Sequence, residues 1–254
     1  NANMLPFFSR RVGLSPSGTP IPIVGGARVS GKADKYDFGF LTMKTERLGS
    51  IPSNNYMVGR VRRNLLTRSW FGGIMTNRDS TQAGDYNRVY GPDAHFVFYN
   101  KLEFDSYLLK SDTPGKAGKN QARRFSTAWR DDELVIVGEY NAVQTNFNPE
   151  AGFIRRRDNT NYSGDLTWKP LLRRSEAIRN LSFGTTGDYF KGGNGKIETR
   201  EEGLNAGVTF ENNAFINATL TQTFDRLINP TKIQNILIPA GDYRYLQYAV
   251  TFNT

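Results

Sequence analysis

The stretch GLNAGVTFE, residues 203–211, alternates apolar and polar side chains along its whole length. In an extended strand, successive side chains point to opposite faces. Leu204 and Val208 therefore lie on one face, and Asn205 and Thr209 lie on the other. This period of two residues predicts a β-strand with one apolar face and one polar face.

The same alternation returns in residues 161–169, 214–224 and 243–252. Its apolar face is too apolar, and its polar face too polar, for a half-buried sheet. A transmembrane β-barrel has this pattern, because each strand meets lipid on one side and the barrel interior on the other. The side chains expected on the outside are Leu204, Val208, Phe210, Ile216, Leu220, Leu246, Val250 and Phe252, and those expected to face an enclosed interior are Asn205, Thr209, Asn217, Thr219, Gln247 and Thr251.

Periodicity and turn residues together divide the chain into a series of strands. The expected strands are 23–32, 35–45, 55–64, 68–77, 93–99, 102–110, 121–129, 134–145, 161–169, 178–187, 203–211, 214–224 and 243–252. No stretch approaches the roughly 18 consecutive apolar residues of a spanning helix. We therefore expect an all-β fold.

The expected connections alternate in length. Short ones fall at 33–34, 65–67, 100–101, 130–133, 170–177 and 212–213, and long ones at 46–54, 78–92, 111–120, 146–160, 188–202 and 225–242. An up-and-down outer-membrane barrel has short periplasmic turns and longer extracellular loops. The alternation thus predicts that all the long connections lie at one end.

Bacterial barrels have an even number of strands. Met4 to Val12 is the candidate for an additional first strand, which would give about 14 strands in an antiparallel barrel. Residues 1–254 are expected to form a single barrel domain, since the composition shows no boundary. The chain begins with Asn1, and we expect it to be part of a longer chain, truncated at both ends.

The composition agrees with a barrel. The mean hydropathy of -0.54 argues against a helical membrane protein, but not against a barrel, because half of each strand faces water. The absence of cysteine excludes disulfides and thiolate metal sites. No cofactor and no metal site is expected.

The net charge of +9 raises the question of nucleic-acid binding. The basic clusters are scattered over strand ends and loops, whereas nucleic acid requires a coherent basic stripe. We expect no nucleic-acid partner. Contact with outer-membrane lipid and lipopolysaccharide, or an anion-selective interior, explains the charge better. Envelope proteins are further candidate partners. The basic clusters mentioned above are Arg10-Arg11, Arg60 to Arg63, Arg155 to Arg157 and Arg173-Arg174.

Four basic side chains share the polar phase of two predicted strands: Arg28, Lys32, Arg60 and Arg62. An arginine facing lipid near the bilayer midplane costs about 2 to 4 kcal/mol. We therefore expect these residues to face the lumen. They would either form a positive wall that favours anions or, alternatively, pair with acidic residues that fill the barrel.

Catalytic signals are weak. His95 is the only histidine, and Asp93 lies two residues before it on the same strand face, as in a hydrolase where a carboxylate orients a histidine. A strand residue beside a turn aspartate is the simpler explanation. The sequence therefore predicts no catalytic residues.

Several segments resemble the membrane β-barrel domain of the DUF5916 family, whose members carry a carbohydrate-binding family 9-like domain before the barrel. The matching segments are Pro6 to Leu14, Pro20 to Lys32, Arg60 to Arg78 and Tyr86 to Ala94, with Gly39-Phe40-Leu41 and Thr45. The resemblance is strongest over the first hundred residues. It implies a barrel in a bacterial envelope, and no particular reaction.

The function expected from the sequence is that of a bacterial outer-membrane β-barrel protein without catalysis, acting as a porin-like pore, a transporter or a membrane anchor. Two alternatives remain open. One is a soluble all-β carbohydrate-binding module, whose apolar faces would meet inside a sandwich. The other is an envelope hydrolase that uses His95.

Overall fold

The computed structural model describes residues 4–15, 17–172 and 175–254. The arginine pair 173–174 lies outside the described residues. The described residues contain no α-helix and only one 3-10 turn, η1 (Ser9–Arg11). The strands are β1 (Met4–Leu5), β2 (Ile23–Ala33), β3 (Tyr36–Thr45), β4 (Asn54–Leu66), β5 (Ser69–Ser80), β6 (Tyr86–Phe98), β7 (Leu102–Asp112), β8 (Gln121–Arg130), β9 (Leu134–Val143), β10 (Phe153–Ile154), β11 (Asn159–Trp168), β12 (Ile178–Gly192), β13 (Ile197–Phe210), β14 (Phe215–Leu227), β15 (Thr231–Ile233), β16 (Ile236–Ile238) and β17 (Gly241–Asn253).

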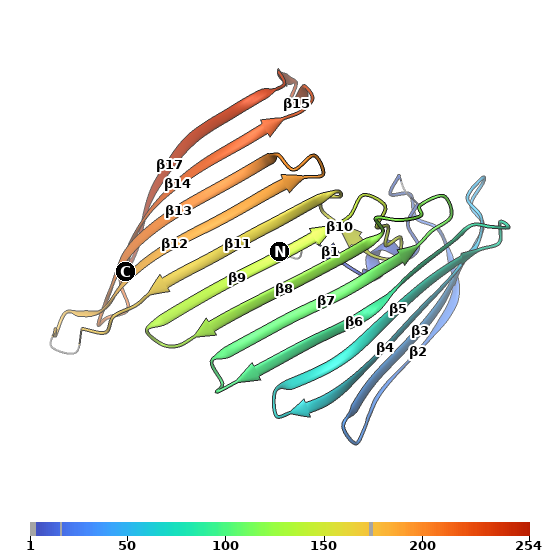
Figure 1. The fold of residues 1–254 in the computed structure, drawn as a ribbon, viewed down its shortest axis with the longest axis horizontal. Coiled ribbons are helices and arrows are strands. Elements are labelled where there is room, and N and C mark those ends of the chain that lie inside the picture. Colours follow the sequence, from blue (N-terminus) through green and yellow to red (C-terminus); the bar gives the residue numbers. More distant parts are fainter. Residues whose placement is uncertain (1–3, 16, 173–174) are drawn as a thin grey trace. The chain divides into compact units, whose positions relative to one another are not determined.

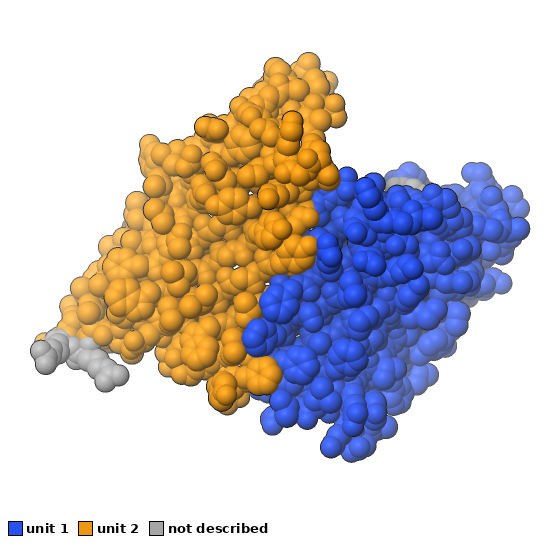
Figure 2. Space-filling view, viewed as in Figure 1, with its two compact units in different colours: residues 1–97, 104–125, 141–159 blue, residues 98–103, 126–140, 160–254 orange. Residues whose placement is uncertain are grey.

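Thirteen of these strands form one antiparallel sheet in chain order, from β2 to β9, then β11 to β14 and β17 (Figure 1). Each strand predicted between residues 23 and 252 overlaps one strand of this sheet, so the all-β, up-and-down prediction is confirmed. β2 and β17 form its two edges, and no closed barrel is seen among the described residues. The chain divides into two compact units, coloured separately in Figure 2.

The predicted strand from Met4 to Val12 is wrong. Only Met4–Leu5 is extended, and it pairs with β10 instead of joining the large sheet. Pro6 has no backbone N–H to donate to a ladder, and the 3-10 turn follows it. The large sheet therefore has thirteen strands in place of the expected fourteen.

Two of the expected long connections are short. Strands β6, β12 and β13 are longer than predicted. Only residues 81–85 therefore lie between β5 and β6, and only residues 193–196 lie between β12 and β13. The connections at 46–53, 113–120, 144–158 and 228–240 are long, as expected, but the connection at 169–177, which was expected to be short, exceeds the first two of them. The alternation of length is therefore only partly retained.

In the first unit (1–97, 104–125 and 141–159), register separates two faces of the sheet. Val29, Phe40, Gly59 and Met75 align across β2 to β5, and the apolar members of this row are 59%, 43% and 50% exposed. The next row aligns Leu41, Val58, Thr76 and Val89, of which the last three are buried. We call these the exposed face and the covered face.

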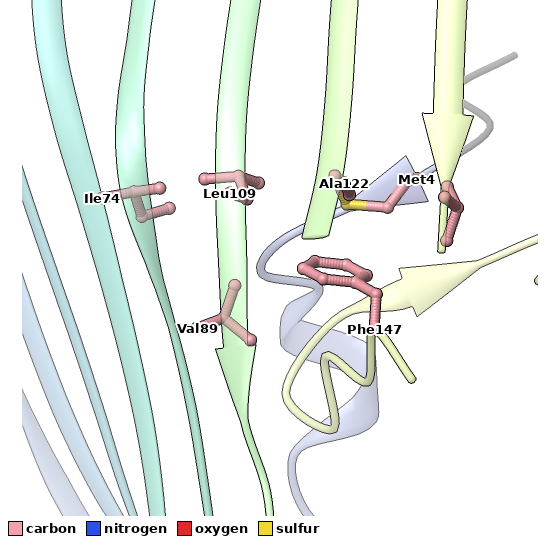
Figure 3. Packing of buried hydrophobic residues seen from close by; sticks show 7 residues of the cluster. Met4, Ile74, Val89, Leu109, Ala122 and Phe147 are labelled. Carbon is pink, nitrogen blue, oxygen red and sulfur yellow. The ribbon is translucent and has the colours of Figure 1, made fainter. Parts of the chain in front are cut away.

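The covered face carries the core of this unit. Residues 4–15 and 144–154, here called the covering segments, pack on it: Met4 and Phe147 join Ile74, Val89, Leu109 and Ala122 in one buried cluster (Figure 3). Phe8 N donates to Ala151 O at 2.8 Å. A Cβ at position 152 would lie 2.3 Å from Leu5 O, so glycine is required where the two segments meet.

The second unit (98–103, 126–140 and 160–254) shows the same exposure of apolar side chains. Leu204, Leu220 and Tyr248 align across β13, β14 and β17 and are 58%, 40% and 81% exposed. In the predicted outer set, Leu204, Ile216, Leu220, Leu246, Val250 and Phe252 are exposed as expected, whereas Val208 and Phe210 are half-buried.

The predicted inner set is only partly covered. Asn205, Thr209, Asn217 and Thr219 are half-buried, but Gln247 and Thr251 are exposed, because β17 is an edge strand with a neighbour on one side only. The apolar faces of the two units meet no second large sheet among the described residues. The pairing of sheets that a sandwich requires is therefore not seen there.

Phe147→Ala should lower the free energy of unfolding by about 3 to 5 kcal/mol, since Phe147 is fully buried between the covering segments and the sheet. Urea titration of the detergent-solubilised protein measures this change. Phe40→Ala, at a side chain on the exposed face, is the matched control and should cost less than about 1 kcal/mol. Equal losses in the two variants would contradict the packing of the covering segments.

Candidate functional site

The four basic residues predicted to face the lumen lie on the same side of the sheet. Register places Lys32, Asp37, Arg62 and Gly72 in one row, and Gly39, Arg60 and Ile74 in the row two residues along, which lies on the same face. Ile74 belongs to the buried cluster, so this is the covered face. Arg28 and Lys32 are exposed on the edge strand β2, and Lys32 Nζ lies 3.7 Å from Asp37 Oδ1.

Arg60 and Arg62 meet at Trp70. The Arg62 guanidinium lies 4.1 Å from the centre of the indole ring, and that of Arg60 lies 5.6 Å from it. Each geometry allows a cation–π interaction. A Cβ at position 72 would lie 2.9 Å from Arg62 Cγ and 2.6 Å from Val61 O, so Gly72 leaves the space in which Arg62 lies.

The alternative in which Asp93 orients His95 is not seen in the structure. Asp93 forms an ion pair with Arg60, and His95 Nδ1 lies 2.8 Å from Asp105 Oδ1 on β7. The histidine ring also stacks on Trp70, with 6.0 Å between ring centres. No serine or threonine hydroxyl of the described residues hydrogen-bonds to His95, so a nucleophilic triad does not form around it.

This cluster holds buried polar atoms that lack a hydrogen-bond partner in the protein. They include Arg60 Nε, Arg62 Nε, Asp37 Oδ1 and Asp93 Oδ1. Buried charged groups without hydrogen bonds are costly, and solvent usually satisfies them. The covered face at the start of β5 is therefore chemically suited to contact with water.

A second charged centre, not predicted from the sequence, lies at the other end of β5. Arg78 is buried and donates from Nη1 and Nη2 to the two carboxylate oxygens of Asp85, at 3.0 and 2.5 Å. Its Nε lies 2.6 Å from Glu150 Oε2, and its Nη1 donates to Asn54 Oδ1 at 2.8 Å. Arg78 thus links β4, the β5–β6 turn and a covering segment.

Arg78 also controls the acidity of Asp85. The hydrogen bonds from the guanidinium hold the pKa of the Asp85 carboxyl below its usual range, against a smaller opposing effect of burial. The buried guanidinium thus forms ion pairs with two carboxylates, those of Asp85 and Glu150.

A cavity of about 340 Å³ adjoins this cluster. Both covering segments, β4 and the β5–β6 turn line it. Arg11, Tyr56, Arg78, Asp85, Glu150 and Arg157 are its polar and charged side chains of most chemical interest. The volume lies within the range of small-molecule pockets.

Among the described residues, no group of three or more His, Asp or Glu side chains is arranged to hold a metal ion. Within the same ranges, no helix is long and apolar enough to cross a bilayer. Comparison with protein-family models, curated proteins and solved structures gives no match for this chain. The resemblance to the DUF5916 family therefore stays a prediction.

The Asp85 pair predicts acid sensitivity. A carboxyl whose pKa is lower in the folded state stabilises the fold above its unfolded pKa, and this contribution is lost as the pH falls through the folded value. The free energy of unfolding should therefore decrease below about pH 4. Asp85→Asn should remove part of that dependence, under about 1 kcal/mol because the side chain is partly exposed.

Chemical denaturation between pH 2.5 and 7 measures this effect, with pH values chosen around about pH 4. Asp132→Asn is the control, because this exposed aspartate in the β8–β9 turn forms no ion pair with any residue that the structure describes. If both variants keep the full pH dependence of the parent chain, the Arg78–Asp85 pair does not contribute to acid stability.

Proposed function

We propose that this chain forms part of the wall of a bacterial outer-membrane β-barrel. The observation that carries the proposal is the exposure of large apolar side chains along one face of the sheet in each unit, among them Phe40, Met75, Leu204 and Leu220. Soluble monomers rarely expose contiguous apolar surface of this extent. Lipid acyl chains are the environment that such a face fits, and outer-membrane lipid and lipopolysaccharide are the proposed partners.

The opposite face supports the same proposal. Arg60, Arg62 and Asp93 lie there with polar atoms that no protein group satisfies. Water in a barrel interior would hydrate them, whereas lipid would not. The cost of an arginine in lipid thus favours one orientation of the sheet, with the covered face inward.

The proposed role is that of a pore, a transporter or a membrane anchor. In the first unit the covering segments occupy part of the inner side of the sheet, and Arg60 is neutralised by Asp93. These features favour a partly filled interior. Arg62 has no carboxylate partner within ion-pair distance in the described chain, and it would supply positive charge to any open passage.

Leu220→Arg should impair insertion into lipid vesicles, because it places a charge on the proposed lipid face of β14 at a cost of about 2 to 4 kcal/mol. Thr219→Arg, one residue earlier and on the opposite face, is the matched control and should insert nearly as well as the parent chain. Insertion is measured by heat-modifiable migration in detergent gels after folding into vesicles. Equal insertion of both variants, or a parent chain that remains in the aqueous fraction, would refute the proposal.

If the interior is open, it should prefer anions. Replacing both Arg60 and Arg62 with serine should shift the reversal potential toward cations in planar-bilayer recordings of the complete protein under a salt gradient. Arg63→Ser is the control, since Arg63 lies on the exposed face, with its guanidinium 5.8 Å from the Tyr36 ring centre.

Complete absence of conductance would rule out an open pore and leave the transporter and anchor roles. In that case the double replacement should instead reduce stability, because it leaves Asp93 without its ion-pair partner.

A further inference from the structure

The cavity beside Arg78 contains hydrogen-bonding groups that the fold does not use. Tyr56 is 8% exposed, lines the cavity, and its hydroxyl forms no hydrogen bond with any described residue. The hydroxyl oxygen is not among the buried side-chain atoms without a partner, so it keeps access to solvent and is open to a ligand. The position of this donor in a cavity of about 340 Å³ indicates a site for a ligand atom that accepts a hydrogen bond.

The charge of the cavity indicates the kind of ligand. Both acidic side chains in its lining, Asp85 and Glu150, are already within ion-pair distance of Arg78. The other two basic side chains, Arg11 and Arg157, have no acidic partner among the described residues, and Arg157 makes one hydrogen bond, to Asn148 Oδ1 at 2.9 Å. Two guanidinium groups with free donors therefore remain at the cavity, and no carboxylate is free.

Apolar side chains complete the lining on the side of the N-terminal covering segment and the β3–β4 connection. They include Leu14 and Ile51, together with Ile21, which lies just before β2. A ligand with one charged end and one apolar end would match this division, as most small-molecule sites combine an apolar wall with a few polar groups.

We propose that this cavity binds a small organic anion, a carboxylate or a phosphate monoester attached to an apolar group. Arg11 and Arg157 pair with the charged end, and the Tyr56 hydroxyl donates a hydrogen bond to one of its oxygens. Arg78 holds the walls of the site together through Asp85, Glu150 and Asn54. This inference goes beyond the proposed function and does not require insertion into a bilayer.

Isothermal titration of the full chain in detergent micelles tests the proposal, with benzoate and phenyl phosphate as anionic probes. Benzamidinium is the cation of similar shape, and micelles without protein give the blank. At least one anion should bind, and the ratio of the two affinities distinguishes the carboxylate from the phosphate. Benzamidinium should not bind measurably.

Three variants locate the site. Tyr56→Phe removes only the hydroxyl and should weaken binding about tenfold, as expected for one hydrogen bond to a charged acceptor. Arg11→Gln should weaken it by roughly fivefold, a typical effect for a partly exposed charge pair. Arg10→Gln is the matched control, because Arg10 belongs to the same 3-10 turn but does not line the cavity, and it should leave the affinity unchanged.

The proposal is overturned if neither anion binds the folded parent chain, or if benzamidinium binds more tightly than both. It is also overturned if the Tyr56 and Arg11 variants bind as well as the Arg10 variant. Arg11 is exposed on a turn, so its replacement leaves the fold intact and keeps the test valid even if Tyr56→Phe reduces stability. Failure of membrane insertion would not affect this result, since the titration is done in detergent.

Discussion

Register between neighbouring strands is the constraint on which both faces of the sheet depend. Val29, Phe40 and Met75 belong to one cross-strand row, and Val58, Thr76 and Val89 to the adjacent one. A slip of one residue in a single strand would exchange its two faces and place buried side chains among exposed ones. The buried cluster under Met4 and Phe147 and the charged groups around Trp70 both require the same register, so they reinforce each other.

The periodicity of two residues was sufficient to predict the order and nearly all positions of the thirteen strands, because each strand repeats the signal independently. Predictions from local sequence failed at positions where pairing or packing with distant parts of the chain decides the structure. Gly91-Pro92 indicates a turn, yet both residues lie within β6, where Gly72 and Gly73 of β5 pair opposite Asp93 and Pro92. At the N-terminus, apolar residues suggested a strand, whereas Pro6 and the 3-10 turn direct them onto the covered face.

The charged sites were less predictable, because their partners come from different strands. The sequence identified Arg60, Arg62, Asp93 and His95, with a local Asp93–His95 pair as one alternative. In the fold, Asp93 pairs with Arg60 across the intervening strand β5, and His95 pairs with Asp105 on the neighbouring strand β7. The cluster around Arg78 gave no sequence signal at all. Asn54, Asp85 and Glu150 approach it from three separate segments, and only the fold brings them together.

The pairing of β1 with β10 has a consequence for the order of folding. Met4 must find Ile154, which follows the eight strands β2 to β9 in the chain. Closing this contact therefore costs more chain entropy than closing a hairpin between adjacent strands. Contacts between residues distant in sequence form late when nearer ones are available. We therefore expect the N-terminal segment to dock after the sheet beneath it has formed. During synthesis its apolar side chains would then stay exposed until residues 144–154 have been made.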